Sequence, residues 1–558
     1  MFNARWNPWL LSLCLVCACS GNEKTVADAG CDVCSDADAA TDVDVDVEEP
    51  VEFDIQRIFD DVAWLAHDDR GGRLPGAGGN TASVEYVRAL FEELGLTPGG
   101  DNGTFLQEFT FSIWELVGEP EVTVDGTPLE NGTELLVMQY SGTGLVEAEI
   151  VFVGHGMTVP PFDPAAFPDC PLPATGYDDF ADVDVGGKIA LVMRRGPANL
   201  EAVHNYCPAG IACAGAPCLW NFGYKARNAF LHGAAGVMMI NNYQLAGAVP
   251  PDVTLGADYY LADLPVVFAD RSAMEAALPE LPSWAAAIDA DLAQHSRATG
   301  VNALLHVETE MNTAVSHNVV GVLPGTDPEL AAEVIVVGAH VDHVGMDSVT
   351  GEIYNGADDN ASGTAVMMEL ARAFALGGRP PARTLVFAAW NAEELGLVGS
   401  CHHVQFPAFP ISQTVAAYSV DMVGAGNGTG LAVFGATEAE NRWLLEVMNG
   451  QALELGLAFY GTGMPPLDAS DHVCFAYSGV PAVLLSTLGG HAYYHTPQDT
   501  IDTILLRDLE AAVWLSWAGI HPIAMGTELR YLDSRKTVST TTPSPDAAEA
   551  LSRRQRHR

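Results

Sequence analysis

Basic residues are scarce in this chain. Its 558 residues include 25 lysines and arginines against 72 aspartates and glutamates, which gives a formal net charge of -47. A surface this negative repels both nucleic acid and anionic membranes. We therefore expect no nucleic-acid partner and no electrostatic attachment to a membrane.

Long apolar runs are also missing. The run Trp9–Ala18 follows Arg5 and is too short to cross a bilayer, and no later run is long enough. It has the form of the apolar segment of a secretory signal. It ends Val16-Cys17-Ala18-Cys19-Ser20, which resembles a bacterial lipobox. We expect an exported bacterial lipoprotein, either anchored to the cell envelope by a lipid on Cys19 or secreted. The alternative is an ordinary signal peptide with an incidental cysteine.

Cysteines are few, and most of those beyond the signal are clustered. An exported protein meets an oxidising compartment, so the mid-chain cysteines are candidates for two disulfides. These four are Cys170, Cys207, Cys213 and Cys218. Cys401 and Cys474 are a further candidate pair, which the sequence alone does not decide.

The middle of the chain has short apolar runs separated by helical patterns. Strands are expected at 148–153, 188–193, 236–240 and 265–268, and helices near 225–231 and 272–278. Two stretches here, Val185-Gly186-Gly187-Lys188-Ile189-Ala190-Leu191-Val192 and Lys225-Ala226-Arg227-Asn228-Ala229-Phe230, are followed by Gly233-Ala234-Ala235-Gly236-Val237. The block resembles a protease-associated domain, which is a non-catalytic insertion in peptidases. An unrelated small α/β domain is the alternative.

The second half of the chain alternates apolar strands with helices. Strands are expected at Val334–Gly338, Thr384–Ala389, Val415–Val420 and Ala482–Leu485, with a helix at Thr364–Leu376. Nearly continuous apolar strands alternating with helices predict an α/β fold with a mixed, mostly parallel sheet sandwiched by helices. Ligands bind at the carboxyl ends of the strands in such sheets.

Acidic residues and histidines stand at those strand ends. They occur in Ala339-His340-Val341-Asp342, Asp358-Asp359-Asn360, Glu393-Glu394, Asp421 and Tyr494-His495. Carboxylates and imidazoles brought together from separate strands are the ligands of a zinc site. A single acidic pair could cap a helix, but five such positions in one domain predict a metal centre.

This set of residues, in this order, resembles the M28 family of zinc-dependent peptidases, which have an aminopeptidase-like α/β fold. The resemblance includes the loop Gly72-Arg73-Leu74-Pro75-Gly76. It covers segments before and after the protease-associated block. It implies a peptidase domain in two segments, 53–138 and 306–530, with the inserted domain 139–305 between them. A signal peptide 1–19 and an acidic disordered tether 20–52 would precede them, and a disordered tail 531–558 would follow.

The resemblance also implies two zinc ions and a division of roles. The implied ligands are His340 and Asp421 for the first ion, Glu394 and His495 for the second, and Asp359 bridging both. Glu393 would be the general base, Tyr494 would stabilise the oxyanion, and Asp342 would orient His340. A cis Asp359–Asn360 peptide bond is implied as well. Two rivals stay open, His343 as a ligand and Asp358 as the bridge.

We therefore expect a zinc exopeptidase that acts on peptides or proteins as an aminopeptidase. A carboxypeptidase of the glutamate carboxypeptidase kind is one alternative, but it needs basic residues near the site, and this domain has few. A glutaminyl cyclase-like acyltransferase works with one zinc, whereas the full ligand set is present here. An inactive surface binding protein is the third alternative, and it would have lost ligands.

Overall fold

A computed structural model gives the fold over most of the chain. It describes residues 51–526 except 139, 166–171, 198–211, 214–215, 218–221, 246–261, 348–349, 427–430, 436–440, 455–462, 465–469 and 490. The expected signal, Cys19, the tail, nearly all of the tether, and Cys170, Cys207 and Cys218 lie outside the described residues. No described helix combines the length and apolarity needed to span a bilayer.

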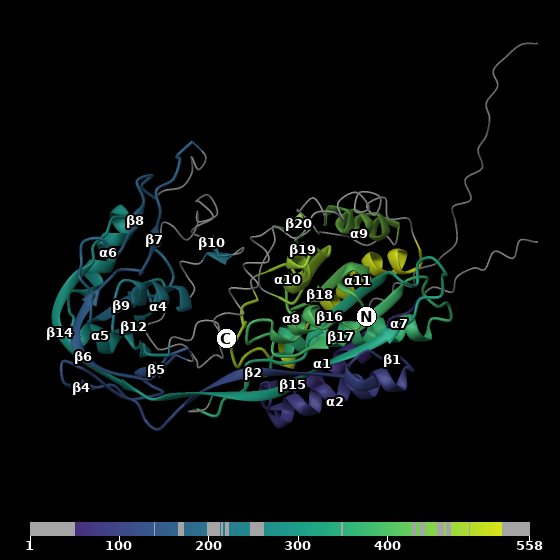
Figure 1. Ribbon diagram of the computed structural model, residues 1–558, viewed down its shortest axis with the longest axis horizontal. Helices are drawn as coiled ribbons and strands as arrows, with labels where there is room; N and C mark the ends of the chain where they lie inside the picture. Colours follow the sequence, from purple (N-terminus) through teal and green to yellow (C-terminus); the bar gives the residue numbers. More distant parts are fainter. Residues whose placement is uncertain are drawn as a thin grey trace, which may run out of the picture. The chain divides into compact units, whose positions relative to one another are not determined.

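Among the residues that the structure describes, the larger of two main sheets has nine strands. Figure 1 shows the sheet. Four parallel neighbours form its centre, in the order β17 (Thr384–Trp390), β16 (Val334–His340), β18 (Thr414–Val420) and β21 (Ala482–Thr487). Every residue of these four strands is buried. The strands expected from the apolar runs are therefore present, and the parallel arrangement is confirmed at the centre of the sheet.

The flanks of this sheet are partly antiparallel. β15 (Thr309–Leu323) runs antiparallel to β17 and also pairs with β1 (Thr97–Pro98) and β2 (Leu106–Leu116). On the other side, β19 (Leu431–Phe434) runs antiparallel to β21 and parallel to β20 (Gly463–Met464). The sheet is therefore mixed, as predicted, with its parallel strands innermost.

Helices cover both faces of the larger sheet. One face packs in a single core with α1 (Ile55–Leu65), α2 (Gly78–Glu93), α7 (Gly363–Leu376), α9 (Arg442–Glu454) and α11 (Leu506–Ala524). The other face packs with α8 (Val398–Gln405) and α10 (His472–Tyr477), and Trp390 and Phe475 lie in that core. The predicted sandwich of a sheet between helices is confirmed.

Two helix starts show how local sequence sets the elements. Asp54 caps α1, and its side chain accepts a hydrogen bond from the backbone N–H of Arg57. The helix α2 begins at Gly78. A Cβ at Gly79 would lie 1.9 Å from the carbonyl oxygen of Arg70, so glycine lets this first turn pack directly against the preceding loop.

The second sheet has eight strands in the part of the chain that the structure describes, and it packs against two apolar clusters of its own. In order they are β4 (Thr127–Pro128), β3 (Glu121–Val124), β14 (Arg297–Val307), β6 (Gly144–Phe152), β9 (Ile189–Met193), β12 (Gly236–Ile240), β13 (Val266–Ala269) and β5 (Leu135–Val137). The helices of this region are α4 (Phe222–Leu231), α5 (Arg271–Ala277) and α6 (Leu281–Asp291). Because β3, β4 and β5 belong to it, this sheet takes in residues upstream of the expected boundary at 138.

Candidate metal centre

Three neighbouring strands deliver most of the site. β16 ends at His340, β17 leads into Glu393 and Glu394, and β18 is followed directly by Asp421. Because these strands are parallel and adjacent, their carboxyl ends lie at one edge of the sheet. Asp359 reaches the same place from the turn before α7, and the segment after β21 brings in His495.

The first group of donors is His340, Asp359 and Asp421, all of them buried. His340 Nε2 lies 3.3 Å from Asp359 Oδ1 and 3.3 Å from Asp421 Oδ1. Three donors from three different segments therefore converge here, which makes this group a candidate cation site.

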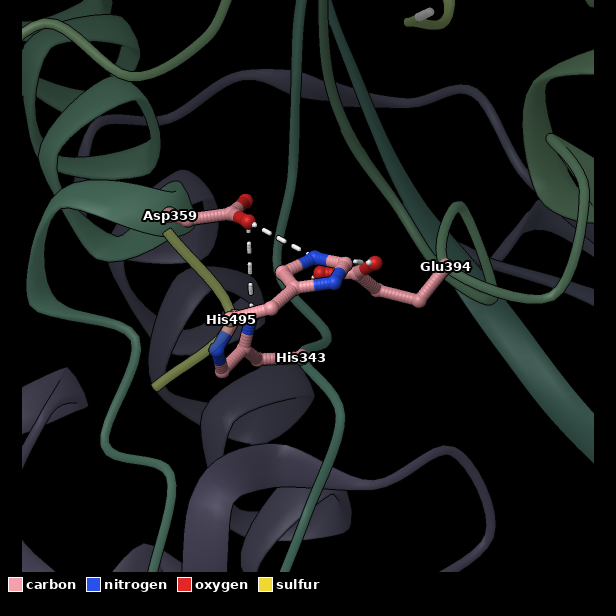
Figure 2. A group of neighbouring side chains, drawn as sticks. All are labelled: His343, Asp359, Glu394 and His495. Carbon is pink, nitrogen blue, oxygen red and sulfur yellow. Dashed lines mark hydrogen bonds and ion pairs between the residues drawn. The ribbon is translucent and has the colours of Figure 1, made fainter. Parts of the chain in front are cut away.

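The second group is His343, Asp359, Glu394 and His495, and the four side chains point toward one another (Figure 2). His495 Nε2 lies 3.1 Å from Asp359 Oδ2 and 3.0 Å from Glu394 Oε2. Asp359 thus turns one carboxylate oxygen to each group, as a bridging ligand would. His343, the rival ligand, lies within this second group.

The donor chemistry of both groups fits metal ions. Asp421 Oδ1 and His495 Nε2 are buried, and neither makes a hydrogen bond to any residue that the structure describes. Buried polar atoms are normally hydrogen-bonded, and a cation in each group would give these two atoms a partner. Carboxylate and imidazole donors suit zinc.

Charge within the site is tightly balanced. Burial opposes ionisation of Glu394, but the positive charge of His495 and the close contacts with His343 and His495 outweigh it and lower the pKa of Glu394 to about 2. Burial would also keep His495 neutral, yet Glu394 and Asp359 raise its pKa to about 10. These acids need a positive partner, and a metal ion supplies a stronger one than imidazolium.

Glu393 differs from its neighbour. It shares a group with His340 and Glu394, but it is not a member of the two groups described above. Burial, together with the charges of Glu394, Asp471 and Asp421, raises the pKa of Glu393 well above its usual value. Glu393 thus lies beside the two donor groups, in surroundings that favour the protonated form of its carboxyl group.

Asp342 supports the glutamate turn more than the histidine. Its two carboxylate oxygens accept hydrogen bonds from the backbone N–H groups of Glu393 and Glu394, at 3.2 and 3.3 Å. The Asp342 carboxylate lies 3.8 Å from His340 Nδ1. The backbone carbonyl oxygen of Asp342 lies closer to the same nitrogen, at 3.3 Å. Asp342 thus contacts His340 through its backbone and holds the glutamates through its side chain.

Tyr494 lies at the rim of the site. Its side chain is 53% exposed, and its ring stacks on His495 with ring centres 3.8 Å apart. It also lines a small pocket together with Met422 and His491. Tyr494 is thus beside the second donor group but open to solvent.

Asp358, the rival bridge, is turned away from both donor groups. Its Oδ1 accepts hydrogen bonds from the backbone N–H groups of Gly424 and Ala425, and its Oδ2 lies 2.7 Å from His491 Nδ1. The cis peptide bond between Asp359 and Asn360 is present. The geometry therefore favours Asp359 over Asp358 as the bridging carboxylate.

Arg73 was not among the expected site residues, yet it lies directly beneath the site. It is fully buried and donates hydrogen bonds to five backbone carbonyls, those of Leu65, Val341, Asn355, Gly356 and Asp359. Burial lowers the pKa of Arg73 to about 10, so it remains a cation at neutral pH. In the sequence, Arg73 stands inside a glycine-rich loop. Such a pattern is typical of an exposed side chain, so its burial was not expected.

Asp499 supports the same turn from another segment, and it too was missed. Its carboxylate accepts hydrogen bonds from the backbone N–H groups of Asp358 and Asp359, at 2.8 and 3.1 Å. The turn that presents Asp359 is therefore held on one side by Arg73 and on the other by Asp499.

Two family models match the chain. Residues 318–518 match Peptidase family M28, and residues 146–277 match the PA domain. The first match contains every predicted metal ligand together with Glu393 and Tyr494. The second match falls within the chain segment whose strands form the eight-stranded sheet, as predicted for a protease-associated domain.

Curated relatives and solved structures point the same way. The chain is 25% identical to Aminopeptidase YwaD of Bacillus subtilis, over 71% of this chain and 72% of that protein. It is 32% identical to an aminopeptidase of Pseudomonas aeruginosa, over 66% of this chain but only 56% of that protein. In fold it is similar to the aminopeptidase from Aneurinibacillus sp. strain AM-1, with a TM-score of 0.60, 23% identity, and 86% and 95% of the two chains covered.

Proposed function

The chain belongs to peptidase family M28, and from this premise we propose that it is a two-zinc aminopeptidase that removes N-terminal residues from peptides. One observation carries the proposal: the two donor groups share Asp359, and Glu393 lies beside them. Paired metal ions with a carboxylate bridge and an adjacent acid–base residue are the equipment of a hydrolase.

In this proposal the chain's own residues divide the work. His340, Asp359 and Asp421 hold one ion, and Asp359, Glu394 and His495 hold the other. Bound zinc would supply Lewis acidity and would make water acidic enough to lose a proton near neutral pH.

Glu393 takes up that proton and passes it to the leaving amine, a step worth about 10²–10⁴-fold in rate. Asp342 keeps Glu393 and Glu394 in place through their backbone N–H groups. Tyr494, half exposed above His495, donates a hydrogen bond to the substrate oxygen that becomes negative.

Charge near the site supports an aminopeptidase over a carboxypeptidase. A substrate carboxylate needs a free cationic side chain, but Arg73 is buried and uses its guanidinium on backbone carbonyls. The acids at the site instead suit the positive amino group of a peptide N-terminus. The same reasoning makes N-blocked peptides poor substrates.

The test compares free and blocked substrates. A panel of aminoacyl-p-nitroanilides would be assayed beside their N-acetyl copies, with zinc counted by elemental analysis. Two zinc ions per chain, chelator-sensitive cleavage of the free forms and no cleavage of the blocked forms are expected. Cleavage of peptides with a free carboxyl terminus but a blocked amino terminus would instead show a carboxypeptidase, and a protein without zinc would contradict the mechanism.

A further inference from the structure

The second donor group contains one histidine more than the family resemblance supplies. We propose that His343 is a fourth protein ligand of the ion held by Asp359, Glu394 and His495. The inference rests on the proposed function, since it assumes that this group binds zinc. It concerns a residue that the resemblance assigns to no role.

Distances within the group are of the size expected between ligands of one ion, with Glu394 turning Oε1 to His343 and Oε2 to His495. His343 Nδ1 lies 2.8 Å from Glu394 Oε1 and 3.7 Å from Asp359 Oδ2. Donors around a tetrahedral zinc with bonds of about 2.0–2.1 Å are about 3.3 Å apart. The observed separations fall on either side of that value, and those of His495 from Asp359 and Glu394, at 3.1 and 3.0 Å, lie close to it.

The surroundings hold the His343 ring in this position. The side chain is fully buried, and its backbone N–H donates to the carbonyl oxygen of Arg73. A Cβ at Gly356 would lie 2.5 Å from two ring carbons of His343, so only a glycine leaves room for the ring. The imidazole is therefore packed closely against the backbone at Gly356 while Nδ1 faces Glu394.

A fourth protein ligand would make the two metal positions unequal. Four protein ligands close a zinc site, whereas three leave a position open for water or substrate. The ion bound with His343 would then be the tightly held one. The open position would belong to the ion held by His340, Asp359 and Asp421.

A simpler role competes with ligation. His343 Nδ1 could only donate a hydrogen bond to Glu394 and so orient that ligand. Loss of such an outer hydrogen bond typically weakens metal binding about 10–100-fold. Asparagine keeps an N–H donor near the position of Nδ1 but is a poor zinc ligand, so His343→Asn separates the two roles.

The first measurement is zinc X-ray absorption on the wild-type protein, which counts imidazoles around the metal. With zinc at saturation we expect three imidazoles for every two zinc ions, from His340, His343 and His495. Only two would be counted if His343 were not a ligand. This count needs no variant, so it decides the proposal even if a substituted protein fails to fold.

The second measurement compares zinc affinity by competition with a chelator. We expect His343→Asn to weaken the tighter zinc by more than about 100-fold, beyond the range of an outer hydrogen bond. His295→Asn is the matched control, because His295 Nε2 lies 2.9 Å from a carboxylate, that of Asp291, but is outside both donor groups. It should leave the imidazole count and the tighter affinity unchanged.

The outcomes separate the inference from the proposed function. Two imidazoles per two zinc ions, with a loss of affinity under about 100-fold in His343→Asn, would overturn the role of His343 and leave the aminopeptidase proposal standing. A wild-type protein that binds no zinc would overturn the proposed function itself.

Discussion

Two adjacent glutamates at the end of β17 hold different positions in the site. Glu394 turns one carboxylate oxygen to His343 and the other to His495, at 2.8 and 3.0 Å. Glu393 lies near His340 instead, and its burial beside other acids raises its pKa. Neighbouring residues at a strand end leave the chain in different directions, so one can hold metal while the other faces substrate.

Replacing the proposed base tests this division directly. We expect Glu393→Gln to keep both zinc ions and to lower kcat about 10²–10⁴-fold, because the amide cannot take up a proton. Glu352→Gln, on an exposed residue, is the control and should leave kcat unchanged. Loss of zinc from Glu393→Gln, measured by elemental analysis, would show that Glu393 is a ligand.

Arg73 gives a prediction about stability. Arg73→Met would leave five buried carbonyls without their donor, and each unpaired group costs about 1–3 kcal/mol. We expect the free energy of unfolding, measured in urea, to fall by more than about 3 kcal/mol. Arg88, which pairs with Glu85 and Glu92 on the surface of α2, is the control. Arg88→Met should change stability by less than about 1 kcal/mol, and equal losses would contradict our interpretation.

At the scale of elements, the site depends on how closely helices approach the sheet. α7 begins at Gly363, and a Cβ there would lie 2.1 Å from the carbonyl oxygen of Val420. Val420 is the last residue of β18 and precedes Asp421. The turn that leads into α7 and the end of β18 therefore hold two proposed ligands, Asp359 and Asp421, close together.

Gly363→Ala should separate these two elements. We expect a loss of about 1–3 kcal/mol in the free energy of unfolding together with weaker zinc binding, because the new methyl group overlaps Val420. Gly450→Ala in α9 is the control, since nothing lies within 4 Å of a Cβ there. That change should stabilise the protein by about 0.5–1 kcal/mol. The same sign of effect at both glycines would refute the packing argument.

A disulfide ties two helices on the other face. Cys401 in α8 and Cys474 in α10 are bonded across a sequence separation of 73 residues, which decides the pairing that the sequence left open. α10 begins at His472, next to Asp471, whose charge acts on Glu393. The bond therefore limits movement of a segment beside the proposed base.

Removing this bond should lower the stability of the protein, because the unfolded chain gains conformational freedom. Closing a loop of this length is worth about 4 kcal/mol in the chain-entropy model. We expect Cys401→Ala combined with Cys474→Ala to lower the free energy of unfolding by up to that amount. Reductant should lower the stability of the wild type further than that of the double variant, as chemical denaturation would measure. An equal effect of reductant on both would mean that this bond contributes nothing.

At the scale of the whole molecule, charge opposes folding. The chain carries 72 acidic and 25 basic residues, so its net charge of -47 creates repulsion that grows as the chain becomes compact. Some of that repulsion gathers at the metal centre, where four acids lie together. These are Asp359, Glu393, Glu394 and Asp421.

Salt should therefore stabilise the protein. The screening length falls from about 30 Å in 0.01 M salt to about 8 Å in 0.15 M salt, which weakens long-range repulsion among surface acids. We expect Tm to rise by a few degrees over this range, measured by calorimetry at one scan rate with zinc held constant. A Tm that falls with added NaCl would mean that attractive ion pairs, not repulsion, dominate the surface.

Much of this protein was determined by sequence alone. The central strands of the catalytic sheet follow from apolar runs, and the ligand candidates follow from the residues that come directly after those runs. Parallel neighbours end at one edge, so His340, Glu394 and Asp421 had to meet. The family could be recognised for the same reason.

Tertiary structure decided where those side chains point. Sequence places Asp358 beside Asp359 and His343 near His340, but only packing turned Asp358 toward His491 and His343 toward Glu394. It also buried Arg73 under the site and assigned β3, β4 and β5 to the second sheet. The physical reason is that residue order sets which groups reach a strand end, whereas side-chain direction depends on contacts with segments that are distant in the sequence.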